Sequence, residues 1–368
     1  MVRLTTILRF AAVSLALVLS LAVSEPAGAS IWSIQRAPAR PGAGDTVLAA
    51  VSCTSAVACI AVGGPDAEPG MMLAERWDGA QWTIQPVPKP SRSIQSFLTG
   101  VSCTSASDCL AVGYSVDARG ASAALATRWD GSRWRSAPIP RPAGSELSLL
   151  SGVSCGAASA CTAVGGVESR AGVWFALVER WDGARWTFQR TPRVSYSELT
   201  GVSCASAAAC TAVGLYAEGE IVEHWNGRKW WLDRSRGIAS GDTELTAISC
   251  AAATACIAGG GVVIPSMVTW PVLQRWSSGR WSVGPMPAQP PGMVYGVSCT
   301  SKADCAAVGS DALVEELEGR GWSLDTAPDP NQGNLYGVSC TWRICFAVGS
   351  WVERSGREVP LVESTVSS

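Results

Sequence analysis

Apolar residues in this chain fall into short runs separated by turn residues, and the same succession of runs returns along the sequence. In one stretch the runs cover residues 98–103, 109–114, 123–129 and 134–139. Small and β-branched residues dominate the first two runs and aromatic residues the last two, as half-buried strands require. The pattern predicts four short strands, followed by the same four strands again.

The repeated unit can be written L-x-G-V-S-C-x5-C-x-A-V-G, followed downstream by E-R-W-D-G-x-x-W. The copies follow one another with a period of about 50 residues, and a fixed period of this length in strand-type sequence is typical of a β-propeller. The first cysteines of the copies are Cys53, Cys103, Cys155, Cys204, Cys250, Cys299 and Cys340.

The two ends of the chain indicate how the repeat closes. The seventh copy stops after residues 359–363, without the W-x5-P strand that follows in other copies, and that strand stands instead at residues 32–38. An N-terminal strand that completes the last blade leaves no exposed edge, whereas a solenoid would need capping repeats. We therefore predict an all-β fold, a seven-bladed β-propeller of four-stranded blades in which the N-terminal strand closes the ring.

Tryptophans flank the turn between the third and fourth strands. A pair that faces across two strands contributes roughly 1 kcal/mol, and burial of the rings against the next blade contributes more. We interpret these residues as the packing seam between blades. The sixth copy departs from the pattern with Leu317 and Trp322. The complete pairs are Trp77/Trp82, Trp129/Trp134, Trp181/Trp186, Trp225/Trp230 and Trp276/Trp281.

The first residues have the pattern of an export signal. Arg3 and Arg9 accompany an uncharged stretch at 10–23, and residues 27–29 (Ala-Gly-Ala) supply a small-residue cleavage site. We predict a signal peptide at 1–29 and the propeller domain at 30–368. The mature protein is then secreted, free or held at the cell envelope, with no membrane span after cleavage. A second uncharged stretch, 245–274, carries the repeat in register and is interpreted as part of a blade.

The cysteines form seven local pairs, each around the turn between a first and a second strand. Directly opposed residues of an antiparallel hairpin are close enough for a disulfide, and export favours oxidation. With no C-x2-C motif and a single histidine, the sequence indicates no metal site, and we expect no cofactor. The predicted disulfides are Cys53–Cys59, Cys103–Cys109, Cys155–Cys161, Cys204–Cys210, Cys250–Cys256, Cys299–Cys305 and Cys340–Cys345.

The charge balance argues against nucleic acid as a partner. The formal net charge is -2 and the pI about 5.6. A nucleic-acid-binding protein needs a concentrated basic face to displace phosphate counterions. We therefore expect an extracellular partner of another class, and a monomer.

His224 is the only histidine. It holds the position that Arg76, Arg128, Arg180 and Arg275 hold in other copies, and no nucleophile motif stands beside it. We interpret it as a repeat substitution that packs along the third strand, and we assign no catalytic residue.

Glu75, Glu179 and Glu223 recur one position before this basic residue. Paired carboxylates suit glycoside hydrolysis when they flank one bond, but these are dispersed one per blade. We interpret them as a structural ladder with the neighbouring arginines.

The repeat is least regular between the second and third strands. In a propeller these turns share one face with the blade-to-blade connections, and variable segments on a rigid scaffold are where binding residues concentrate. Exposed aromatic rings anchor sugars and protein partners. The uncharged segment 260–271 is the best candidate for an exposed apolar patch. The variable segments are 64–70, 114–121, 166–173, 215–220, 260–271 and 350–358. The candidate binding residues are Trp174, Trp270, Trp351, Tyr114, Tyr216, Tyr295 and Tyr336.

Parts of the repeat resemble known propellers. The D-G-x-x-W hairpin resembles the Asp-box of sialidase-type propellers, and the period and closing strand resemble kelch propellers. As a whole, the G-V-S-C…C-x-A-V-G…E-R-W-D-G-x-x-W repeat is similar to that of uncharacterised secreted propeller proteins of high-GC Gram-positive bacteria. The resemblance covers nearly all of the mature chain, and it implies a secreted propeller and no known activity.

Three functions remain open at this stage, and the third is a purely structural envelope protein without selectivity for any ligand. The leading hypothesis is a binding module that presents its variable face to an extracellular glycan, in a carbohydrate-binding role, or to an envelope protein. The alternative is a glycan-active enzyme, a sialidase-like hydrolase or lyase with its site at the ring centre. That alternative would need the loop residues Asp66, Asp117, Arg119, Glu168 and Arg170 to converge.

Overall fold

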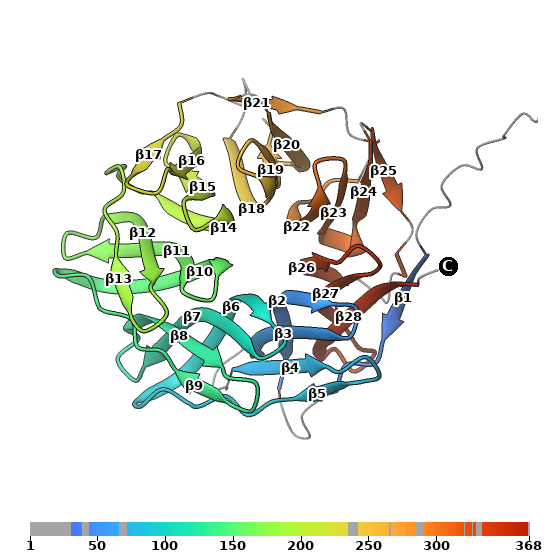
Figure 1. Cartoon of the computed structure of the whole chain (residues 1–368), viewed down its shortest axis with the longest axis horizontal. Coiled ribbons are helices and arrows are strands. Elements are labelled where there is room, and N and C mark those ends of the chain that lie inside the picture. Colours follow the sequence, from blue (N-terminus) through green and yellow to red (C-terminus); the bar gives the residue numbers. More distant parts are fainter. Residues whose placement is uncertain are drawn as a thin grey trace, which may run out of the picture.

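Four-stranded antiparallel sheets stand around a central axis, and the part of the chain described by the computed structural model contains seven of them (Figure 1). The predicted seven-bladed propeller is confirmed. The innermost strand of each sheet faces the axis and the outermost lies at the rim (Figure 1). The described residues are 31–38, 44–65, 72–234, 242–264, 266–277, 279–284, 287, 290–319, 321–325, 327–328 and 333–366.

The first six sheets use their strands in chain order from the axis outward. The first two sheets are β2 (Thr46–Ser55), β3 (Ala58–Pro65), β4 (Leu73–Trp77), β5 (Trp82–Ile84), then β6 (Ser93–Ser105), β7 (Asp108–Asp117), β8 (Ser122–Trp129), β9 (Trp134–Ser136). The next two are β10 (Ser145–Ala157), β11 (Ala160–Ser169), β12 (Trp174–Trp181), β13 (Trp186–Phe188), then β14 (Glu198–Ser206), β15 (Ala209–Tyr216), β16 (Gly219–Trp225), β17 (Trp230–Leu232).

The fifth and sixth sheets have the same order, and the sixth includes the short 3-10 helix η1 (Ser310–Ala312). Their strands are β18 (Asp242–Ala252), β19 (Ala255–Val263), β20 (Thr269–Ser277), β21 (Arg280–Val283), then β22 (Val294–Ser301), β23 (Asp304–Gly309), β24 (Val314–Glu318), β25 (Gly321–Asp325). The seventh sheet contains β26 (Asn334–Cys340), β27 (Cys345–Val352), β28 (Glu358–Val366) and β1 (Ile31–Gln35).

The strands of the second sheet differ in length from the prediction. The first two, β6 and β7, extend beyond the predicted 98–103 and 109–114, because their pairing continues to Ser93↔Asp117. The fourth, β9, ends at Ser136 and not at residue 139. Pro138 and Pro140 follow, and proline has no N–H to donate to a ladder.

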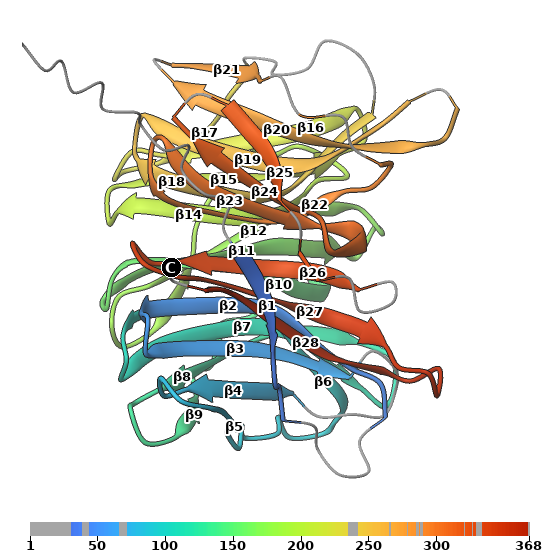
Figure 2. The same ribbon diagram turned by 90° about the vertical axis from the view of Figure 1, so that its right-hand side faces the viewer.

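The N-terminal strand closes the ring as predicted. β1 pairs antiparallel with β28, from Ile31↔Val366 to Gln35↔Val362, and both views place it beside that strand (Figures 1 and 2). Trp32 is 3% exposed, and its Nε1 donates a hydrogen bond of 3.3 Å to Glu316 Oε1 in the sixth sheet. The two ends of the described chain therefore share one sheet and one core.

A circle of hydrogen bonds joins the innermost strands. In every sheet the serine of the G-V-S-C phrase accepts the backbone N–H of the first cysteine of the following sheet, at 2.9–3.0 Å. The bond from Cys53 N–H to Ser339 Oγ crosses the closing seam between the first and seventh sheets. This contact explains why serine precedes cysteine in each copy. The acceptors are Ser52, Ser102, Ser154, Ser203, Ser249, Ser298 and Ser339.

The repeated glycines are required by close approach of backbone. A Cβ on Gly113, the glycine that ends A-V-G, would lie 2.0 Å from the carbonyl oxygen of Phe97 on the paired strand. A Cβ on Gly100 would lie 3.1 Å from Gly152 Cα in the next innermost strand. A side chain at the Gly113 position would force the paired strands apart, whereas the Gly100 position accepts alanine in the first and fifth sheets, at Ala50 and Ala247.

All seven predicted disulfides are present. Each joins residues that are directly paired across a hairpin, such as Cys103 and Cys109, with Cα atoms 3.9–4.0 Å apart. The described residues contain no free cysteine. The bridges therefore staple the turn at the end of each innermost strand.

The five tryptophan pairs form, with ring centroids 5.3–5.9 Å apart. The rings pack against the preceding sheet and not the next one. Trp82 lies 5.7 Å from Phe346 of the seventh sheet, and Trp134 shares a core cluster with Ile60 and Val62 of the first. The tryptophans pack in this direction because their side chains lie on the side of each sheet that faces the preceding one. The predicted seam between blades is confirmed.

We expect Trp32→Ala to destabilise the protein as much as Trp134→Ala, its counterpart in an internal sheet. Both side chains are buried to the same extent, and removal of a buried tryptophan typically costs about 3–5 kcal/mol. Denaturant unfolding of the two oxidised variants measures the loss. A nearly neutral Trp32→Ala would contradict closure of the ring by β1.

Candidate binding face

The ring has two faces with different composition. We call hairpin face the side with the disulfide turns and the turns between third and fourth strands. We call connector face the side with the turns between second and third strands and the blade-to-blade connections. The seven predicted aromatic residues lie at the starts of first or third strands or in the later half of second strands, which places them in the connector-face half of each sheet.

Each predicted variable segment begins within a second strand. Several have the same five-residue turn, closed by a hydrogen bond of 2.9–3.1 Å between its ends, at 117–121, 169–173, 264–268 and 353–357. Gly120 and Gly172 adopt positive φ in this turn, and Met267 takes the same position with φ 62. Among these four segments the variability therefore concerns side chains more than the turn, whereas the segment 215–220 has a two-residue turn between Tyr216 and Gly219. Part of the segment 64–70 lies outside the described residues.

The predicted aromatic residues do not form one exposed surface. Tyr114 stacks on Phe97 with ring centroids 6.1 Å apart. Tyr216 and Trp351 are half-buried against core clusters of their own sheets. These rings fill gaps in the scaffold, and any role in binding stays a prediction.

Tyr295 and Tyr336 are brought together from adjacent innermost strands, with ring centroids 5.4 Å apart. Ser310 Oγ lies within hydrogen-bonding distance of the Tyr295 hydroxyl, at 3.3 Å. Trp174 begins β12 and is half-buried, whereas Trp270, near the start of β20, is 38% exposed. Beside Trp270, Met267 is 85% exposed, which leaves an apolar surface at the turn of the predicted segment 260–271.

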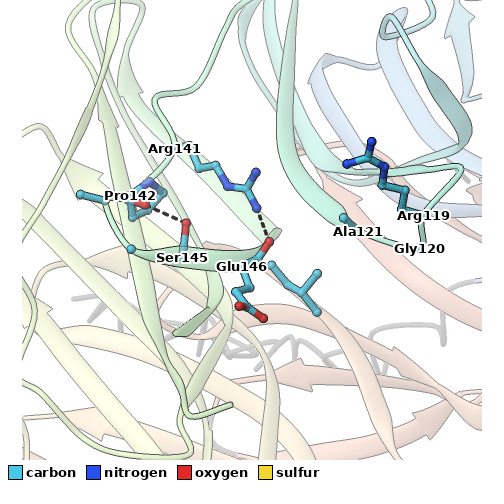
Figure 3. A pocket seen from close by; sticks show the side chains of 10 residues that line it. Arg119, Gly120, Ala121, Arg141, Pro142, Ser145 and Glu146 are labelled. Atoms are coloured by element: carbon cyan, nitrogen blue, oxygen red, sulfur yellow. Dashed lines mark hydrogen bonds between the residues drawn. The ribbon is translucent and has the colours of Figure 1, made fainter. Parts of the chain in front are cut away.

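Two adjoining hollows open on the connector face over the second and third sheets. The first, about 680 Å³, is a wide opening with Arg119 on one side and Arg141 and Glu146 on the other (Figure 3). The second, about 390 Å³, is lined by the ends of β11 and β13, the start of β12 and the connection at 190–193. Residues 142–145 line both hollows and form a wall that the two share. Ligand sites typically have volumes of this size.

The shared wall is held by local hydrogen bonds. Ser145 Oγ donates to the carbonyl oxygen of Pro142 at 2.7 Å, and the guanidinium of Arg141 donates to the carbonyl oxygen of Glu146 (Figure 3). The same serine contact recurs in the neighbouring connection, from Ser197 Oγ to Val194 O. The wall is therefore built into the fold.

The charged residues that line the two hollows are mostly basic. Arg119 and Arg141 line the first with Glu146, and Arg190 and Arg193 line the second with Glu168. Among the described residues, none of the four arginines forms an ion pair with a carboxylate.

The floor of the second hollow is apolar. Phe188 is 47% exposed, and the guanidinium of Arg193 lies 4.6 Å above the ring of Phe175. Next to this hollow, Tyr196 is 58% exposed with φ 58, and its N–H donates to Trp174 O. A positive φ is rare for an aromatic residue and marks a constrained position.

Sequence reasoning missed most of these residues. Arg190 and Arg193 flank a proline in a connection, and the repeat has no fixed residue there. Phe175 was detectable, because the second copy has Ala123 at the same position. What could not be read was the arrangement, since the hollows combine side chains from two sheets.

Of the residues required by the enzymatic alternative, Arg119 lines the first hollow and Glu168 the second, whereas Arg170 lines neither. Asp66 lies outside the described residues. The carboxylate of Asp117 accepts the N–H groups of Arg119 and Ala121 at 2.8 and 3.1 Å, which lowers its pKa below the ordinary value, with a smaller contribution from the guanidiniums of Arg119 and Arg141. This carboxylate therefore stabilises the turn 117–121 in which it stands.

His224 belongs to a buried polar chain between the fourth and fifth sheets. Its Nδ1 lies 3.0 Å from Thr211 Oγ1 and its Nε2 3.1 Å from Asp233 Oδ2. The ring stacks on Trp231 and contacts Trp276, with centroids 4.6 and 4.9 Å away. Burial lowers the pKa of His224, and Asp233 partly opposes this effect. Because His224 is only 7% exposed, a substrate has no access to it.

Arg180 has the equivalent arrangement one sheet earlier. Its guanidinium lies 4.6 Å above the ring of Trp225 in the fourth sheet and donates to Ala207 O at 3.0 Å. Histidine thus replaces arginine as the residue that covers the next sheet's tryptophan. The sequence interpretation treated His224 as a repeat substitution, but it did not include this contact.

The expected ladder of glutamates and arginines is not formed. Consecutive residues of a strand point to opposite faces, so Glu179 and Arg180 lie on different sides of β12. Glu179 and Glu223 are fully buried between sheets, and no described residue forms a hydrogen bond with their carboxyl oxygens. Burial raises the pKa of each to about 8, and that of Glu315 in the sixth sheet to about 7.

No group of three or more potential metal ligands occurs among the described residues. The same part of the chain contains no helix that could span a lipid bilayer.

No protein-family model and no curated protein sequence matches this chain. Solved structures match it over nearly its whole length. "YCF48 bound to D1 peptide" is 11% identical with a TM-score of 0.55, over 94% of this chain and 100% of the other. A chain of the mitotic checkpoint complex is 12% identical with a TM-score of 0.57, over 99% of each chain. The propeller domain of Cps50 (Swd1) from Myceliophteria thermophila is 11% identical with a TM-score of 0.55, over 92% and 100%. At such identities the likeness shows the β-propeller fold.

We expect replacement of buried glutamates by glutamine to change how stability depends on pH. The pKa of Glu179 and of Glu223 is about 8 in the folded protein against an ordinary 4.5. The folded protein therefore holds protons that the unfolded chain releases, and stability falls as the pH rises from about 4.5 through about 8. Glu179→Gln and Glu223→Gln remove this fall. A pKa difference of one corresponds to about 1.4 kcal/mol, so Tm at about pH 8 should rise by several degrees.

Thermal unfolding followed by circular dichroism at about pH 5 and about pH 8 measures the effect. Glu218→Gln, at an exposed turn, makes the same chemical change and should leave the pH dependence as it is. A lower Tm of Glu223→Gln at the higher pH would contradict the buried neutral carboxyl.

Proposed function

We propose that this protein is an extracellular interaction module that holds a protein partner on its connector face. Seven disulfides indicate an oxidising environment. The ring is continuous through β1, so it supplies a rigid platform. The structure titled "YCF48 bound to D1 peptide" is a precedent for a propeller that binds a peptide. Export through a signal peptide at 1–29, in keeping with the secreted propellers that the repeat resembles, belongs to this proposal.

The observation that carries the proposal is the pair of adjoining hollows on the connector face. Their walls come from connections and turn residues that the repeat does not prescribe, such as Arg119, Arg190 and Phe175. On the hairpin face, a hollow between the fifth and sixth sheets is lined largely by repeat residues, including Cys256, Trp276 and Cys305. Residues that differ from copy to copy are not required by the repeated scaffold, and they are therefore the better candidates for binding a partner.

A protein partner accounts for the connector face better than a glycan or a substrate does. Several predicted aromatic rings are used in packing, although Trp270 remains a candidate for an outer contact. The carboxyl groups of Glu179, Glu223 and Glu315, whose pKa values are raised, are enclosed between sheets. The hollows, by contrast, combine open charged walls with an apolar floor.

Selection of random linear peptides displayed against the oxidised protein tests the proposal. We expect enriched peptides whose binding is lost by at least about tenfold, or 1.4 kcal/mol, in Ala143→Arg. Ala143 is exposed in the wall shared by both hollows.

The matched control is Ala184→Arg, an exposed position in the hairpin-face turn of the third sheet, which should bind the peptides as the parent does. Absence of any enriched peptide, or a loss confined to Ala184→Arg, would contradict the proposal. Selective retention on a glycan array in place of any peptide would favour the carbohydrate alternative.

A further inference from the structure

The two adjoining hollows together form what we call the arginine groove, defined by Arg119, Arg141, Arg190 and Arg193. With Glu146 and Glu168, these residues give the lining a net charge of +2, whereas the whole chain has a formal net charge of -2. The groove is therefore a local basic site on an acidic protein. All four arginines are exposed, and two of them also make contacts within the protein, Arg141 with the carbonyl oxygen of Glu146 and Arg193 with the ring of Phe175.

The positive charge of the groove reaches neighbouring carboxylates. The pKa of Asp117 lies below its ordinary value, first because backbone N–H groups donate to it, and in smaller part because the Arg119 and Arg141 guanidiniums are near. A carboxylate of a ligand placed between these two side chains would be favoured in the same way. Arginine is also the side chain that pairs with carboxylates through two parallel hydrogen bonds.

The floor of the groove is apolar, so it favours a ligand that has an apolar side chain next to its charged groups. Phe188 is half exposed, and Val167 and Ala176 line the same hollow. The ring of Phe175 is covered by Arg193, so this ring does not offer the open aromatic platform on which a sugar stacks. A polyanionic glycan would meet the arginines but would leave the apolar floor without a partner.

The groove is also preorganised for binding. Its central wall, 142–145, is held by the contact from Ser145 to Pro142 and adjoins the bond from Arg141 to Glu146. A wall that is already ordered lowers the conformational cost of binding. A ligand that touches both hollows must pass along this wall, which requires an extended segment.

We infer that the arginine groove binds an extended acidic peptide segment, in which an apolar side chain enters the second hollow while flanking carboxylates meet the arginines. The inference rests on the proposed function and names the chemistry of the partner. Because exposed ion pairs are individually weak, we expect a Kd on the order of 0.1 mM for a short peptide. The affinity should fall as salt is raised.

Fluorescence anisotropy with labelled synthetic peptides tests the inference. The probe has leucine and phenylalanine flanked by glutamates. One counterpart replaces glutamate by lysine, and another replaces the two apolar residues by serine. We expect the probe to bind at least about tenfold more tightly than the lysine counterpart, a difference of 1.4 kcal/mol or more, and more tightly than the serine counterpart.

Two variants locate the site on the protein. The double variant Arg119→Glu, Arg190→Glu should weaken binding of the probe by at least about tenfold. Phe188→Ser, which introduces the residue that the second sheet has at Ser136, should weaken it less. The control Arg228→Glu reverses one exposed charge in a hairpin-face turn and should leave the affinity unchanged. Equal binding of the lysine counterpart, or unchanged binding by the double variant, would overturn the inference.

A polygalacturonate competitor separates an acidic peptide from an acidic polysaccharide. Displacement of the probe as effective as that by unlabelled peptide at equal carboxylate concentration would overturn the choice of a peptide. The display experiment separates this inference from the proposed function. Selected peptides that Ala143→Arg rejects but that lack acidic residues would leave the function in place and refute the acidic ligand.

Discussion

The contact between neighbouring innermost strands is the constraint on which the rest of this structure depends. Around the axis the backbones come so close that a Cβ on Gly100 would nearly touch Gly152. At that separation each G-V-S-C serine accepts the first cysteine N–H of the following sheet. The circle closes at the seam where Cys53 of the first sheet donates to Ser339 of the seventh, and β1 completes the seventh sheet at its outer edge. Serine recurs because it makes this contact in all seven sheets, and a small residue, glycine or alanine, recurs where the innermost strands approach.

A scaffold built in this way confines functional variation to particular places. The seams between sheets take the same tryptophans in most copies, and a change there affects the fold. Even the buried Glu179 and Glu223, whose pKa values are raised by burial, belong to the seams and face no solvent. Side chains can vary freely at the turns and connections of one face. The groove over the second and third sheets is such a departure, with charge and apolar surface that the ring itself does not need.

The sequence was sufficient for the fold because each step of that argument was local or periodic. Cysteines six residues apart across a hairpin, tryptophans five apart across a turn and a missing strand at one end can all be read along one dimension. The arginine groove could not be read in this way. Arg119 and Arg190 are far apart in the chain, and they line one groove only because consecutive sheets stand side by side in the ring.

The errors of the sequence interpretation have the same origin. Glu179 and Arg180 are adjacent in sequence, which suggested a ladder, yet the pleat of the strand directs them to opposite seams. The turns on the connector face looked variable because their side chains differ, although several share one backbone conformation. The export signal lies outside the described residues, and it stays a prediction from the pattern of the first residues.

Native-state hydrogen exchange of the first-cysteine amides tests most directly whether the ring behaves as one closed unit. If the serine contacts form a complete circle, the amide of Cys53 at the closing seam is protected by the same free energy as the amide of Cys204 in the middle of the chain, and both exchange only on global unfolding. Markedly weaker protection of Cys53 than of Cys204 would show that the ring opens at the seam, and would contradict the account.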